Sequence, residues 1–182
     1  MDAAKFQELA LRTERPIDSE VVERFEDVAG RAMFLFRQVS EIAQEADRLK
    51  KFIFYGKGGY SSDLEEEPGA ILRAEEDLRM VHGILGLVSE IGEVIDCHQS
   101  YWDGHVETID CVGVLEELGD IGWYCGQLAS AAGSDLGVSY EAVIDKLSER
   151  YPDCFSEQRA LERNLEAERR RLESKIDGEG SF

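Results

Sequence analysis

The sequence contains few prolines and few basic residues. The first shortage favours long helices, and the second limits the kinds of partner that the protein can bind. Proline occurs only 3 times in 182 residues, so long stretches lack the strongest helix breaker. Lysine and arginine number 20 against 39 aspartates and glutamates, which gives a formal net charge of −19. Because phosphate backbones are bound by clusters of lysine and arginine, this charge argues against nucleic acid as a partner. Free nucleotides are not excluded, since their phosphates arrive with a divalent cation.

Long apolar runs and an export signal are also missing. The longest stretch without a charged residue, 121–134, falls short of the roughly 20 apolar residues that a membrane span needs. The segment from Met1 to Lys5 lacks the basic and apolar parts of a signal peptide, so we expect a cytoplasmic protein with no membrane partner. The 4 cysteines form no C-x-x-C pair, and we expect reduced thiols. A zinc site from Cys97, His98 and Cys111 is the weaker alternative, because this spacing matches no known class.

Apolar residues recur at steps of three and four through most of the chain, which predicts an all-α fold. We expect a bundle of four to six helices, with helical segments over residues 3–13, 20–51, 71–100, 109–132, 139–150 and 156–176. The hydrophobic share of 43% suits a single domain over residues 1–182. Its core would span about residues 71–172, preceded by N-terminal extension helices within residues 3–51, with a glycine-containing loop at 56–69. Two long helices joined by the short segment near Asp103 and Gly104 must lie antiparallel.

Paired carboxylates mark these two long helices. Glu90 and Glu93 are three residues apart, as are Glu117 and Asp120, so each pair lies on one helix face with Cβ atoms about 5 to 6 Å apart. If the faces oppose each other, each pair of charges about 4 Å apart costs about 4 kcal/mol at an effective dielectric of 20. A divalent cation would remove that cost, and all-oxygen ligands favour magnesium or manganese. A single E-x-x-E is usually a solvated helix edge, whereas two pairs on consecutive helices indicate a metal site.

Several glycines on the same two helices favour a close approach of their backbones, which would bring the carboxylates together. They lie at positions 83, 86 and 92 of the first helix and 113, 119, 122 and 126 of the second. Glycine costs up to about 1 kcal/mol each in a helix, so a packing reason is expected. The apolar neighbours of the acids, including Leu115 and Leu118, would form the buried face.

These segments resemble a known family. Residues 85–93 (LGLVSEIGE) followed by 115–124 (LEELGDIGWY) are similar to the MazG-like all-α nucleoside triphosphate pyrophosphohydrolases, whose signature is E-x-x-E, a spacer, then E-x-x-D. Residues 146–155 (KLSERYPDCF) resemble the K-L-x-x-R-Y-P-x-x-F segment of phage and bacterial members. Residues 6–13 (FQELALRT) resemble their N-terminal start.

The resemblance implies a function and a set of site residues. Family members are helical, usually oligomeric, and cleave a nucleoside triphosphate between the α and β phosphates to give the monophosphate and pyrophosphate. At the matching positions, Glu90, Glu93, Glu117 and Asp120 would be the catalytic metal ligands for Mg²⁺ or Mn²⁺. Lys146 and Arg150 would bind the substrate phosphates. We expect a homo-dimer or homo-tetramer.

Other assignments rest on the residues themselves. Trp123 follows Asp120 by three positions and could stack on the substrate base, with a core aromatic as the alternative reading. Glu90 is our first choice for the base that orients the attacking water. His82 is expected to be structural.

Two other functions remain open. A helical assembly module could bind nucleotide or metal without turnover, although such a module has little reason to keep four mutually repelling acids. A related hydrolase could act on dUTP or on alarmone nucleotides, because the residues do not fix the preferred base.

Overall fold

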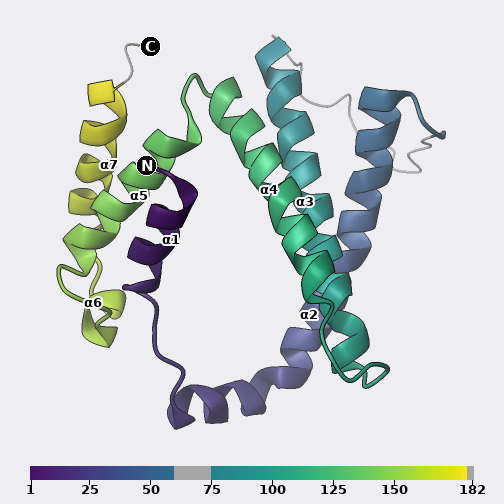
Figure 1. Cartoon of the computed structure of the whole chain (residues 1–182), viewed down its shortest axis with the longest axis horizontal. Coiled ribbons are helices and arrows are strands. Elements are labelled where there is room, and N and C mark those ends of the chain that lie inside the picture. The colour runs from purple at the N-terminus through teal and green to yellow at the C-terminus, as the bar shows by residue number, and fades with distance from the viewer. Residues whose placement is uncertain (60–74, 180–182) are drawn as a thin grey trace. The chain divides into compact units, whose positions relative to one another are not determined.

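The computed structural model describes residues 1–59 and 75–179, and within these ranges every regular element is a helix. The predicted all-α fold is therefore confirmed. Most of the predicted loop at 56–69 and the start of the helix predicted from residue 71 lie outside the described residues. The helices, labelled in Figure 1, are α1 (Ala3–Leu11), α2 (Ser19–Tyr55), α3 (Glu75–Trp102), α4 (Cys111–Ala131), α5 (Leu136–Arg150), α6 (Glu157–Leu161) and α7 (Leu165–Glu179).

Helix ends follow local side-chain caps, which explains where the predicted bounds differ from the observed ones. α5 begins three residues earlier than predicted because Asp135, rather than Ser139, accepts the N–H of Val138. The single helix predicted after Ser156 is divided into α6 and α7. Ser156 caps α6, which ends as Glu162 leaves the helical region with φ −97° and ψ 65°. Asn164 then accepts the N–H of Ala167 and starts α7.

The described helices fall into two compact units. A central unit, Glu26–Ala131, contains most of α2 together with α3 and α4. A terminal unit, Met1–Phe25 and Ala132–Phe182, contains α1 and α5 to α7. The single domain over residues 1–182 stays a prediction.

The central unit is built on the antiparallel pair of α3 and α4, as the short connection predicted (Figure 1). Glycines on α3 permit this approach. A Cβ on Gly86 would lie 2.2 Å from the ring of Tyr124, and one on Gly83 would lie 2.6 Å from Leu128. On the α2 side, a Cβ on Gly92 would lie 2.2 Å from the Cβ of Ala43. The glycine argument therefore holds for α3. On α4 it holds for Gly113, where an added Cβ would lie 2.8 Å from the Sγ of Cys97, whereas Gly119 and Gly122 have no such neighbours within 4 Å.

The terminal unit packs α5 against α1 and α7. Phe6 of α1 stacks on Tyr140 of α5 with ring centroids 4.4 Å apart. The amino group of Met1 lies 2.8 Å from a carboxylate oxygen of Glu141.

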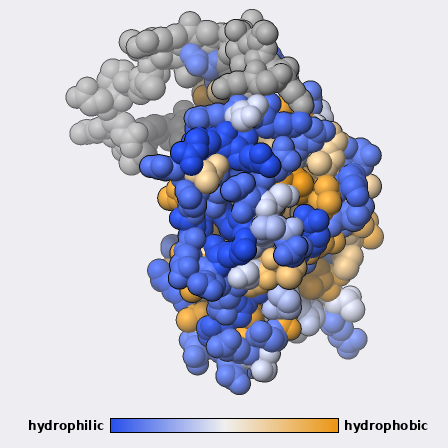
Figure 2. Space-filling view, turned by 90° about the vertical axis from the view of Figure 1, so that its left-hand side faces the viewer, coloured by the Kyte–Doolittle hydropathy of each residue, from blue (hydrophilic) through white to orange (hydrophobic). Residues whose placement is uncertain are grey.

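The face drawn in Figure 2 is mostly hydrophilic, as the excess of acidic residues predicts. None of the described helices combines the length and apolar character needed to cross a membrane.

The contact of Gly92 with Ala43 gives a test of the packing between α2 and α3. We expect Gly92→Ala to lower the free energy of unfolding by about 1–3 kcal/mol, because the new methyl group would overlap Ala43. Gly30→Ala, at a helical glycine of α2 with nothing within 4 Å of its added Cβ, is the matched control. It should raise stability by about 0.5–1 kcal/mol, because alanine has the higher helix propensity. Urea titrations of both variants measure the difference, and equal effects would contradict the close contact.

Candidate functional site

Three of the four predicted carboxylates converge between α3 and α4. Glu90, Glu93 and Glu117 each place one carboxylate oxygen within 4.8 Å of the other two, and we call these three residues the acid cluster. Their meeting follows from the sequence, because the three-residue spacing puts Glu90 and Glu93 on one face of α3 and the antiparallel packing brings α4 to that face. Glu90 is buried, Glu117 is partly buried and Glu93 is exposed. Asp120 is exposed and lies outside the cluster.

Crowding of like charges changes the protonation of the acid cluster. Burial, followed by the charge of Glu93 and a hydrogen bond with Glu90, raises the pKa of Glu117 from 4.5 to about 7. The pKa of Glu93 is also raised, first by burial and then by the charges of Glu90 and Asp47. The cluster therefore holds more protons at neutral pH than three separate carboxylates would.

The donor set of the acid cluster fits a hard divalent cation. All three donors are carboxylate oxygens, which magnesium and manganese accept as ligands. The raised pKa values of Glu93 and Glu117 record a repulsion that such a cation would relieve. In the part of the chain that the structure describes, Cys97, His98 and Cys111 do not form a comparable group, so nothing supports the zinc alternative.

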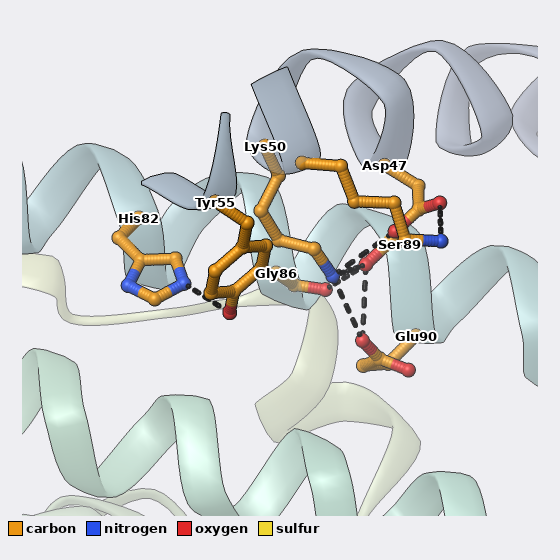
Figure 3. Close-up of polar contacts among 8 residues, drawn as sticks. Asp47, Lys50, Tyr55, His82, Gly86, Ser89 and Glu90 are labelled. Atoms are coloured by element: carbon orange, nitrogen blue, oxygen red, sulfur yellow. Dashed lines mark hydrogen bonds and ion pairs between the residues drawn. The ribbon is translucent and has the colours of Figure 1, made fainter. Parts of the chain in front are cut away.

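A lysine from α2 also reaches the acid cluster, and the sequence analysis did not identify it. Lys50 donates a hydrogen bond to the Ser89 hydroxyl at 2.8 Å, and its ammonium lies 3.3 Å from a carboxylate oxygen of Glu90 (Figure 3). Burial alone would lower the pKa of Lys50, but its interactions with Tyr124, Glu90 and Asp47 raise it.

The helical period of α2 carried a signal for this lysine. Lys50 follows the buried Ala43 and Ala46 by seven and four positions, so it falls on the buried face of α2. A lysine on an apolar face requires a partner. The pattern could therefore have shown that Lys50 is paired, although it could not have shown with which residue.

An aromatic group surrounds His82 on α3. The His82 ring stacks on Phe54 with centroids 4.2 Å apart, and its nitrogens lie 3.2 Å from the Tyr55 hydroxyl and 3.1 Å from the Gln127 amide nitrogen (Figure 3 shows the Tyr55 contact). Burial and then the charge of Lys50 lower the pKa of His82, which favours the neutral ring. These contacts agree with a structural histidine.

Trp123 is 57% exposed, contrary to the alternative of a core aromatic. It stands edge-on to Tyr124, with ring centroids 4.8 Å apart. It also stands edge-on to His82, with ring centroids 6.2 Å apart. An indole that has only edge contacts and is open to solvent is available for stacking on a base.

A cavity of about 410 Å³ opens between α2 and α3 beside the acid cluster. Glu93 borders it, together with polar residues of both helices: Ser40, Gln44, Asp47, Arg48, Ser89 and Asp96. The hydroxyl of Ser40 donates to Asp96 at 2.6 Å across this cavity's lining. Glu93 is therefore a cluster carboxylate that both solvent and a ligand in the cavity can reach.

The predicted phosphate-binding cations, Lys146 and Arg150, lie on α5 of the terminal unit. Arg150 donates two hydrogen bonds to the buried Glu168, and Arg163 donates another at 2.8 Å. The hydrogen bonds from these two arginines lower the pKa of Glu168 to about 2. Lys146 has no carboxylate within 4.0 Å among the described residues. The predicted role of both cations stays a prediction.

A family model described as the MazG nucleotide pyrophosphohydrolase domain matches residues 82–155. This segment of the chain is MazG-like. The matched segment includes the acid cluster and Asp120, whereas Lys50 of α2 lies outside it. The match supports nucleotide pyrophosphohydrolysis as the general class of activity, with a divalent metal as cofactor. Neither a curated protein nor a solved structure matches the chain.

The raised pKa of Glu117 predicts how stability depends on pH. Between about pH 4.5 and 7 the folded MazG-like domain keeps a proton on Glu117 that the unfolded chain releases, so stability falls as pH rises through this window. Glu117→Gln removes this ionisation and should raise the melting temperature at about pH 8 without metal, with little effect at about pH 4. Glu116→Gln, at the exposed neighbouring acid whose charge makes a smaller contribution to the raised pKa of Glu117, is the control and should change the profile less.

Proposed function

We propose that the protein is a magnesium-dependent nucleoside triphosphate pyrophosphohydrolase that releases the monophosphate and pyrophosphate. The observation that carries this proposal is the convergence of Glu90, Glu93 and Glu117 inside the segment that matches the MazG domain. Phosphoryl transfer requires mainly positioning and charge stabilisation, and a carboxylate-bound divalent cation suits both. The choice of magnesium is part of this proposal. The cytoplasmic location is also part of it, and it rests on the sequence alone.

The acid cluster would hold Mg²⁺ or Mn²⁺ through Glu90, Glu93 and Glu117, with Asp120 as a further ligand from α4. When bound, the cation would lower the pKa of a coordinated water and neutralise charge on the triphosphate oxygens. Water then supplies the oxygen of a new P–O bond, and the P–O bond that joins the α and β phosphates breaks. Pyrophosphate leaves with the electron pair of that bond.

Glu93 is better placed than Glu90 to accept the proton of the attacking water. Glu90 is buried, and one of its carboxylate oxygens is already held by Lys50 and Ser89, so it is less open to a water molecule. Glu93 is exposed and borders the cavity, so a water molecule there can approach its carboxylate. A base must lie within hydrogen-bond reach of the water that it deprotonates. This reassignment replaces our first choice from the sequence.

The remaining substrate contacts rest on weaker observations. Trp123 is exposed and three residues beyond Asp120, which supports base stacking. Lys146 and Arg150 are proposed as phosphate-binding cations because of the family resemblance. The ammonium of Lys146 is freer than the guanidinium of Arg150, because the guanidinium is held by Glu168.

Product analysis tests the reaction directly. Purified protein with Mg²⁺ and each nucleoside triphosphate should release pyrophosphate and monophosphate, and no orthophosphate. We expect Glu117→Gln to lower kcat at least about 100-fold, because it removes one of the three converging charges that hold the metal. Glu116→Gln should retain activity.

The same assay separates the competing functions. Turnover confined to dUTP or to alarmone nucleotides would identify a related hydrolase with a narrow substrate range. Nucleotide binding without release of any product, measured with a fluorescent triphosphate, would favour a non-catalytic assembly module. An active Glu117→Gln variant would contradict the assignment of the acid cluster.

We also propose that the chain forms a homo-dimer or homo-tetramer. The apolar stripe that was expected to be buried on α4 is largely exposed, with Val112, Leu115 and Leu118 at 77%, 70% and 52%. The reason for the difference is that Glu117 turns toward α3, which leaves the stripe on other sides of α4. Exposed apolar side chains in series on one helix are typical of a protein interface.

Self-association predicts a specific effect of a charge in this stripe. Leu115→Asp should shift the mass measured by light scattering to that of the monomer, because a carboxylate would have to be buried in the interface. Leu161→Asp is the control, since Leu161 is 80% exposed on α6 of the terminal unit. A wild-type protein that is monomeric at high concentration would contradict the proposal.

A further inference from the structure

Lys50 is a buried cation in contact with a predicted metal ligand. It is 5% exposed, and it comes from α2, which the family match does not include. A lysine taken out of water is strongly destabilising unless it is paired, so its partners are expected to be fixed. Figure 3 shows its ammonium directed toward Ser89 and Glu90.

The contacts of Lys50 hold Glu90 in one place. The ammonium lies 2.8 Å from the Ser89 hydroxyl and 3.3 Å from a Glu90 oxygen, and Ser89 itself lies 3.0 Å from the same Glu90 oxygen. Asp47 lies 3.3 Å from the ammonium on the other side. The ring of Tyr124 lies below it, with the nitrogen 5.2 Å from the ring centroid. These contacts come from α2, α3 and α4, so Lys50 is attached to all three helices of the central unit.

The charge of Lys50 also changes the acid cluster. With all three carboxylates ionised, as metal binding requires, the acid cluster and the Lys50 ammonium together carry a formal net charge of −2. Without the ammonium the same ligands would carry −3. Lys50 and a metal ion are both cations close to Glu90, so each must weaken the binding of the other.

We propose that Lys50 is a positioning residue of the acid cluster, which fixes Glu90 for catalysis and at the same time lowers the affinity of the cluster for a divalent cation. This inference rests on the proposed metal site. The inference predicts two opposite effects of losing Lys50: turnover should become slower, and metal binding should become tighter. A lysine that only joins α2 to α3 would change stability without tightening metal binding.

Lys50→Met tests both expectations, because methionine keeps most of the length of the side chain and removes its charge. Binding of Mn²⁺ alone, measured by calorimetry without nucleotide, should become about tenfold tighter. The kcat of the pyrophosphohydrolase reaction should fall at least about tenfold because Glu90 is no longer held. Magnesium should also raise the melting temperature of this variant by more than it raises that of wild type.

Lys51 supplies a matched control one residue further along α2. It is exposed and pairs with Asp47, as Lys50 does, but it has no contact with Glu90 among the described residues. Lys51→Met removes the same charge, and we expect its Mn²⁺ affinity and kcat to stay within about twofold of wild type. Equal Mn²⁺ affinity of the two variants would overturn the inference and leave the proposed function standing. Wild-type protein that binds neither Mn²⁺ nor Mg²⁺ would overturn the metal site and this inference together.

Lys50→Arg keeps the inference testable if the methionine variant does not fold. Its guanidinium retains the positive charge but cannot reproduce the ammonium contacts with Ser89 and Glu90. We therefore expect Mn²⁺ affinity within about threefold of wild type and a clear loss of kcat with little change of KM. Tenfold tighter Mn²⁺ binding by this variant would contradict the role given to the charge.

Discussion

The close packing of α3 on α4 is the constraint on which the site depends. Gly83 and Gly86 leave space for Leu128 and Tyr124 of α4, and a side chain at either glycine would push the helices apart. Because the helices are this close, the acid cluster forms from both of them. The packing of the core and the position of the acids therefore depend on each other in this unit. The glycines that lower the helix propensity of α3 are the residues that permit the close packing.

Convergence of carboxylates opposes folding, and two features of the structure limit its cost. Glu117 keeps its proton to higher pH, and Lys50 brings a positive charge to Glu90. Stability is thus lowered at the place where we propose that a cation binds, as is common for functional sites. The exposed Glu93 differs from Glu90, because it borders the cavity and has no contact with the ammonium of Lys50 among the described residues.

Local patterns predicted the helices and the meeting of Glu90, Glu93 and Glu117, because helix periods and short connections are written into neighbouring residues. They did not predict that Leu115 would be exposed, since a periodic stripe shows that a face is apolar but not what covers it. They also did not predict Lys50, whose partners Ser89 and Glu90 are about 40 positions away in the chain. Asp120 shares the E-x-x-D spacing and still lies outside the cluster, because spacing fixes a helix face and not the direction of a side chain.

The acids of the site and the lysine that changes its charge come from different helices. The proposed ligands, Glu90, Glu93 and Glu117, belong to α3 and α4, inside the MazG-like segment, whereas the ammonium beside them belongs to α2 outside it. A change in α2 can therefore alter the affinity for a cation without altering any ligand, because electrostatic interactions act through charge and distance rather than through shared bonds. By the same reasoning, a bound cation weakens the attachment of Lys50 to Glu90, so that metal binding and the packing of α2 are linked in both directions.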